Sequence, residues 1–114
     1  MTVKLKDLYR IAVDKGMAED QRDPEELDRV LGEAKKAYDK LDDDEKEFFD
    51  TERFRNPYAD TRICAGDPEI DIRGLIVGVD MEVGEVLLAD RLREKGEPID
   101  LVFAHHPEGP GYAN

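Results

Sequence analysis

Apolar residues in the first half of the chain recur at intervals of three and four, the spacing of amphipathic helices. The first helix is predicted over residues 3–15, with Gly16 as its stop; its apolar face consists of Leu5, Leu8, Tyr9 and Ala12. A second helix begins after Asp23, which is placed as its N-cap, with Pro24 at the first helical position and Glu26 completing a capping box. Its apolar stripe comprises Leu27, Val30, Leu31, Ala34, Tyr38 and Leu41.

A short third helix is predicted within residues 41–54, because its acidic start suits the positive end of a helix dipole. Phe48 and Phe49 are expected to bury there. The pattern then changes at the turn signals Asn56-Pro57 and Gly66-Asp67-Pro68, and the residues 61–65 between them could form a short strand.

The last third of the chain alternates between strand and helix patterns. Residues 72–80 form an almost continuous apolar run, as expected of a strand buried on both faces. The stretch "MEVGEVLLADRLREKG" predicts a helix that ends at Gly96, with Val83, Val86, Leu87 and Leu92 on one side. Residues 99–105 are predicted as the next strand, so the order indicates a βαβ unit with parallel strands.

The predicted fold class is therefore α/β, with N-terminal helices over residues 1–55 packed on a parallel βαβ unit over residues 56–114, together one partial domain. A parallel sheet needs cover on both faces, and the N-terminal helices could cover only one of them. We expect the chain to be the first part of a longer protein, with cover by a partner subunit as the alternative.

Charge and composition narrow the classes of partner. The chain has 114 residues, with 29 acidic and 17 basic side chains and a formal net charge of −12. Such a field repels nucleic acid and anionic lipid, so neither is expected as a partner. No apolar run approaches the ~20 residues of a membrane span, and the N-terminus lacks a signal-peptide pattern. The single cysteine, Cys64, fits a reducing compartment and reads as a small buried side chain, so we expect a cytoplasmic protein.

The candidate chemistry gathers where the two predicted strands end. The first strand ends with Asp80, which is followed by Glu82 and Glu85, and the end of the second carries the two histidines of the chain, His105 and His106. Ligands collect at the carboxyl ends of parallel strands, so these groups are expected along one edge. More ordinary roles remain open: polar residues before a turn for the histidines, N-cap of the following helix for Asp80, and first-turn acids for Glu82 and Glu85.

Two adjacent histidines in a regular strand point to opposite faces and cannot readily bind one ion. At the strand's end they can diverge, each binding a different ion, or the second can turn with the chain. A site with two metals ~3.5–4 Å apart would use one histidine per ion, and each metal needs further ligands that this edge does not supply.

The stretch "GLIVGVDMEVGEVLLADRL" together with "IDLVFAHHPEG" resembles the N-terminal part of the NGG-one interacting factor three (NIF-three-like) family, whose bacterial members are called GTP cyclohydrolase I type 2 homologues. "NPYADTRICAGDPE" and the leading helices are similar to one prokaryotic branch of it. In the family an apolar residue often follows the "HHP", whereas Glu108 and Gly109 stand there in this chain.

The resemblance implies a dinuclear site, two divalent ions of zinc or iron per full-length subunit, with His105 and His106 as two of five ligands. It also implies a homo-oligomeric ring, often a hexamer, and a metal-dependent hydrolase acting on an undefined small molecule. The alternative is a non-catalytic metal-binding, interaction or scaffold protein, and a chain without metal is the third possibility. The final "PEGPGYAN" could approach a phosphate, but a plain loop is the simpler expectation.

Overall fold

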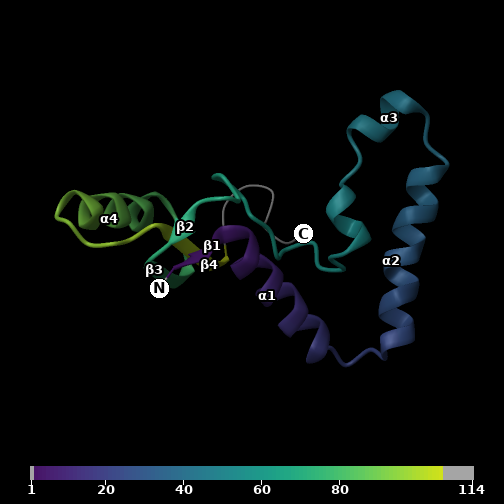
Figure 1. Ribbon diagram of the computed structural model, residues 1–114, viewed down its shortest axis with the longest axis horizontal. Coiled ribbons are helices and arrows are strands. Elements are labelled where there is room, and N and C mark those ends of the chain that lie inside the picture. Colours follow the sequence, from purple (N-terminus) through teal and green to yellow (C-terminus); the bar gives the residue numbers. More distant parts are fainter. Residues whose placement is uncertain (1, 107–114) are drawn as a thin grey trace. The chain divides into compact units, whose positions relative to one another are not determined.

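The computed structural model describes residues 2–106 and combines helices with two small sheets, one parallel and one antiparallel (Figure 1). Its helices are α1 (Leu5–Ala18), α2 (Pro24–Asp39), α3 (Asp43–Glu47), the short 3₁₀ helix η1 (Thr51–Phe54) and α4 (Val83–Glu94). Its strands are β1 (Val3–Lys4), β2 (Asp71–Ile72), β3 (Leu75–Asp80) and β4 (Leu101–His106). This mixture of helices and small sheets confirms the expected α/β class in general terms.

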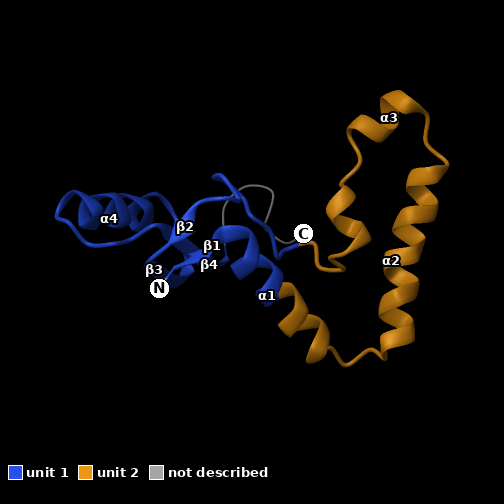
Figure 2. Cartoon of the chain, viewed as in Figure 1, with its two compact units in different colours: residues 1–12, 60–114 blue, residues 13–59 orange. Residues whose placement is uncertain are grey.

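The chain divides into two compact units (Figure 2). Unit 1 comprises residues 1–12 and 60–114, and unit 2 comprises residues 13–59. This division differs from the one drawn between residues 55 and 56, because the start of the chain joins the sheet-forming half. Val3 pairs with Ile72, and the Leu5 N–H donates to the Ile70 carbonyl at 3.0 Å.

The long helix of unit 2 begins as its sequence predicts. Asp23 adopts an extended backbone at the N-cap, and its carboxylate accepts from the Glu26 N–H at 2.8 Å. Pro24 occupies the first helical position. Leu27 and Ala34, one face of the predicted stripe, are buried.

Replacing Asp23 with alanine is expected to lower the free energy of unfolding by about 1 kcal/mol, because an N–H in the first turn loses its acceptor. Asp28→Ala, which removes an exposed acid within the same helix, provides the matched control. Urea denaturation followed by circular dichroism measures both. Equal stability of the two variants would contradict the capping role.

The third predicted helix is shorter than expected, and its aromatic pair divides. The capping box between Asp42 and Glu45 starts α3, which ends after five residues. Phe49 packs with Tyr38 and Phe54, with ring centroids 5.3–5.8 Å apart among the three. Phe48 is 86% exposed, so its predicted burial is wrong. The turn after α3 directs only one of two neighbouring rings inward.

Gly16 does not stop the first helix, which continues to Ala18. A Cβ at this glycine would lie 3.1 Å from the Tyr58 ring, so the residue allows close approach of that side chain. Tyr58 donates from its hydroxyl to Asp20 at 2.8 Å, and Arg22 holds the same carboxylate at 2.9 and 3.1 Å. Hydrogen bonds from Arg22, with a further one from Tyr58, place the pKa of Asp20 well below its usual range.

In unit 1 the predicted βαβ unit is confirmed. β3 and β4 pair in parallel, with Leu75 opposite Leu101 and Asp80 opposite His106. α4 connects them and ends before Gly96, whose φ of 92° lies in the left-handed region that glycine readily adopts. The predicted strand over residues 72–80 is interrupted between β2 and β3, and residues 61–65 form no strand.

An ion pair and backbone hydrogen bonds join the residues that precede β3 and β4, and the contact of Arg73 with Asp100 is called the clasp below. Arg73 contacts both carboxylate oxygens of Asp100 at 2.8 and 2.9 Å, and its N–H donates to the same carboxylate at 3.0 Å. The Asp100 N–H in turn donates to the Gly74 carbonyl at 2.9 Å. The hydrogen bonds from Arg73 hold the pKa of Asp100 well below its ordinary value.

Acid is expected to weaken both carboxylate clusters. Because the pKa values of Asp20 and Asp100 are lowered in the folded state, the stability they contribute is present above the unfolded value of about 4. It is lost as the pH falls below that value toward the folded one. Urea unfolding of the Asp20→Asn/Asp100→Asn double variant should therefore show lower stability at neutral pH and a smaller further loss on acidification. A loss as steep as that of the wild-type chain would argue against these two groups.

The two faces of the parallel sheet differ in cover. Met81 is buried, and its side chain lies over Gly78 on the face that also carries Ile76. On the other face Val77 and Val79 are 64% and 59% exposed. Within the described residues β3 is therefore covered on one face and exposed on the other, so the cover that a parallel strand needs on its second face is not supplied by them.

The face of α4 also differs from its prediction. Ala89 is buried and Leu92 is partly covered, whereas Val83, Val86 and Leu87 are exposed. At 100° per residue Leu92 lies opposite Val83, so the four predicted residues cannot share one side. The helix is apolar on more than one face, which makes the burying side ambiguous from its sequence.

Candidate metal centre

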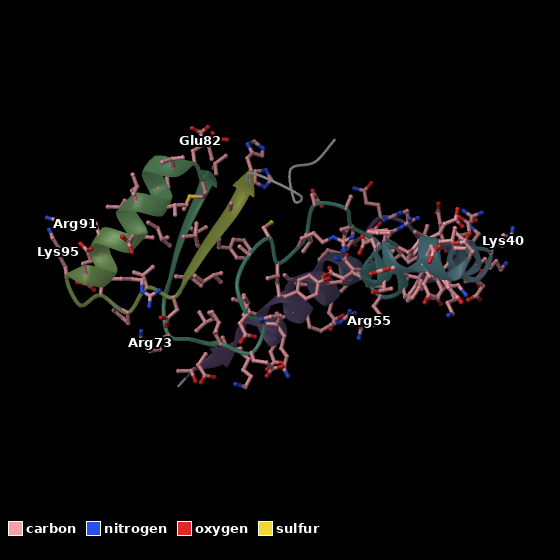
Figure 3. The ribbon with its side chains drawn as sticks, turned by 90° about the horizontal axis from the view of Figure 1, so that it is seen from above. Lys40, Arg55, Arg73, Glu82, Arg91 and Lys95 are labelled. Atoms are coloured by element: carbon pink, nitrogen blue, oxygen red, sulfur yellow. The ribbon has the colours of Figure 1, made fainter. Side chains whose placement is uncertain are left out.

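The candidate residues lie at the carboxyl end of the parallel strand pair. Figure 3 shows Glu82 at the end to which the β4 arrow points, and Arg73 at the other end of the strands. β3 ends at Asp80 and β4 at His106, and these two residues are register partners. The prediction that the carboxylates and the imidazoles share one edge of the sheet is confirmed for Asp80 and His106.

The two histidine rings lie side by side. Strand alternation places His105 in phase with Val79 and Phe103, and His106 in phase with Gly78 and Ala104. The rings nevertheless stack, with centroids 4.6 Å apart and planes inclined by 27°. They are not splayed to opposite faces, because the alternation of directions need not continue at the last residues of a strand. Both residues are exposed, which leaves their edges accessible to a ligand.

Asp80 directly contacts the second histidine. Its Oδ1 lies 2.8 Å from Nδ1 of His106. The backbones of the two strands also meet just beyond this pair, where the Met81 N–H donates to the His106 carbonyl at 3.4 Å. The carboxylate therefore stands behind one ring nitrogen and leaves the other, Nε2, on the far side of the ring.

The N-cap of α4 is Glu82, so the expectation that Asp80 caps this helix is wrong. The Glu82 N–H donates to the Glu85 carboxylate at 2.8 Å, which engages Glu85 in the first turn of the helix. The two residues between the strand and the helix separate Asp80 from the helix start. The sequence contained a signal for this later helix start, because Glu82 and Glu85 are three residues apart, the spacing of a capping box.

The donor chemistry fits part of a metal site. Neutral imidazole is a common ligand of zinc and iron, and two imidazoles are present here at one strand end. Within residues 2–106, however, no group of three or more His, Cys, Asp or Glu side chains is placed to hold a metal ion together. The described residues thus bring together two candidate ligands, His105 and His106, and the carboxylate of Asp80. The tail "PEGPGYAN", with Glu108 and Gly109, lies outside the described residues.

Other candidate features lie elsewhere. Cys64 is exposed, with Sγ 3.8 Å from the Arg62 carbonyl, so its predicted burial is wrong. A shallow hollow of about 230 Å³ opens at the other end of β3, and its lining is mostly apolar. The one charged side chain in that lining, Arg73, is engaged by Asp100. Neither feature places reactive groups together as the strand ends do.

No helix among residues 2–106 has both the length and the apolar character needed to cross a membrane. Comparison with known proteins adds no relative: no family model, no curated protein and no solved structure matches this chain.

Proposed function

We propose that this chain is a dinuclear metal-binding protein of the NIF-three-like family, with His105 and His106 each binding one of two divalent ions. The observation that carries the proposal is the exposed, stacked histidine pair at the carboxyl ends of two parallel strands. Ligand sites of open α/β sheets lie at such strand ends. The proposed fold is the first part of the larger α/β fold of that family.

The spacing of the rings supports a pair of ions. Ring centroids 4.6 Å apart can face ions separated by the ~3.5–4 Å of two-metal sites. Zinc and iron suit imidazole, and each ion requires at least four ligands in such centres. Each ion would therefore need ligands in addition to its histidine.

The proposed activity is metal-dependent hydrolysis of a small molecule. His105 and His106 would hold two cations, which when bound would lower the pKa of a water molecule and polarise a substrate oxygen. The exposure of both histidines at the strand ends leaves room for a substrate beside them. No catalytic carboxylate is assigned.

A non-catalytic metal-binding or scaffold protein is the second candidate, and the exposed apolar surface favours it. Val77, Val79 and Phe103 share the less covered face of the sheet, and large apolar patches mark association surfaces. We propose homo-oligomerisation for either candidate, without nucleic acid or membrane as partner. The location proposed is the cytoplasm, in keeping with the free thiol of Cys64.

Competition of the purified chain with a chromophoric chelator for Zn²⁺ and Fe²⁺ tests the proposal. Binding that depends on the histidine pair supports it, and a chain that takes up neither ion overturns it. Hydrolysis of a phosphoester or nucleotide by the metal-loaded chain distinguishes the enzyme from the scaffold. Metal binding without turnover across such a panel favours the second candidate.

A further inference from the structure

We infer that Asp80 is a positioning residue that holds His106 in the tautomer with the proton on Nδ1, so that Nε2 presents its lone pair outward. The inference rests on the proposed function, because the outward lone pair of Nε2 is the one that would bind a metal ion. The juxtaposition that carries it is Asp80 Oδ1 at 2.8 Å from His106 Nδ1.

The direction of this hydrogen bond follows from the groups involved. An ionised carboxylate has acceptor sites only, so a contact of this length requires a proton on the imidazole nitrogen. In the neutral ring the second nitrogen then carries no proton and can act as a ligand. Histidines that bind metals commonly donate their other ring N–H to a carboxylate, which sets both tautomer and ring orientation.

The fold makes Asp80 available for this role. Parallel register places it opposite His106, so the two side chains come from adjacent strands at the same level. α4 takes its cap from Glu82, which frees Asp80 from the capping that the sequence suggested. The stacked ring of His105 lies 4.6 Å away, so a fixed His106 ring also limits the positions open to its neighbour.

The exposure of the His106 and Asp80 side chains determines how much Zn²⁺ affinity the loss of their contact should cost. The side chains of His106 and Asp80 are 54% and 68% exposed, and water competes for such a contact. Loss of a partner behind a metal-binding histidine costs 10–100-fold in affinity in general. We expect the lower end here, about tenfold weaker Zn²⁺ binding on Asp80→Ala.

Two-bond ¹⁵N–¹H correlation spectra of the metal-free chain, recorded where both rings are neutral, give a direct test. The wild-type chain should show His106 with its proton on Nδ1. Asp80→Ala should move the ring toward the Nε2–H form that free imidazole side chains prefer. Asp80→Asn replaces the acceptor-only carboxylate with an amide that can either accept from or donate to Nδ1, so it should hold the Nδ1–H form less strongly than the wild-type chain does. The control is Asp90→Ala, which removes an exposed acid of α4 and should leave the spectrum unchanged.

The spectrum and the Zn²⁺ titration answer different questions. An Nε2–H tautomer of His106 in the wild-type chain, or an Nδ1–H tautomer that persists in Asp80→Ala, overturns the inference whether or not zinc binds. An Nδ1–H tautomer lost in Asp80→Ala supports it even when Zn²⁺ does not bind, and in that case only the proposed function fails.

Discussion

Zinc binding should be lost when His105 and His106 are both replaced with alanine. Removing the partner behind a ligand costs 10–100-fold in metal affinity, so removing both ligands should weaken Zn²⁺ binding by more than about 100-fold. Each single variant separates two geometries. If each ring holds its own ion, a single substitution removes one bound ion and leaves the other. If both rings share one ion, a single substitution removes that ion. Chelator competition combined with metal analysis measures affinity and stoichiometry together.

The double variant should remain folded, because both histidines are exposed at the end of a strand. Surface substitutions change stability by about 0.5 kcal/mol or less, and the His106–Asp80 contact is an exposed one. Urea denaturation should therefore give nearly equal free energies of unfolding for the variant and the wild-type chain. Unchanged zinc binding in a folded double variant would refute the assignment of the histidines as ligands.

Alanine at two glycines should change stability in opposite directions. At Gly74 a Cβ would lie 2.5 Å from the Pro98 carbonyl oxygen, and that atom belongs to backbone that cannot swing aside. The strain should cost about 1–3 kcal/mol, the range for overpacked sites, and should loosen the clasp between Arg73 and Asp100. At Gly32, within α2, nothing lies within 4 Å of the added atom. There the better helix propensity of alanine should add about 1 kcal/mol.

Both substitutions add one methyl group, so the difference between their effects on the free energy of unfolding reports the surroundings of the two glycines. Equilibrium unfolding in urea, followed by circular dichroism, gives the free energy for each variant. In addition, Gly74→Ala should weaken hydrogen-exchange protection of the amides in β3 and β4, whereas Gly32→Ala should not. Equal stabilities for the two variants would show that the close approach between Gly74 and Pro98 is relaxed in solution.

Local signals in the sequence predicted most element starts and stops. Asp23 and Pro24 begin α2, and Gly96 follows α4, because capping and backbone freedom depend on neighbours only a few residues away. The same local character made Gly16 misleading. Its contact with the Tyr58 ring joins residues 42 positions apart in the chain, and no pattern around Gly16 indicates that contact.

The candidate site was predicted in its members and not in its internal contacts. The apolar runs before Asp80 and His106 predicted two strands, and strand order predicted a shared edge. The exact register, which sets Asp80 against His106, depends on how two strands align, and a shift of one residue would reverse the side-chain directions. The role of Asp80 changed accordingly, from expected helix cap to partner of a histidine.

By itself the sequence determined the helices, the βαβ order and the placement of two histidines at a strand end, since each follows from residue spacing and turn chemistry over short range. Only the tertiary structure decided that the histidine rings stack, that Asp80 stands behind His106, and that Val77 and Val79 face outward. The contact of Asp80 with His106 and the exposure of Val77 and Val79 depend on the alignment of segments separated by more than twenty residues and on which surfaces meet, and the stacking of the neighbouring histidine rings departs from regular strand alternation. Contacts between distant segments depend on the packing of the whole chain, so no periodic pattern of residues in the sequence indicates them.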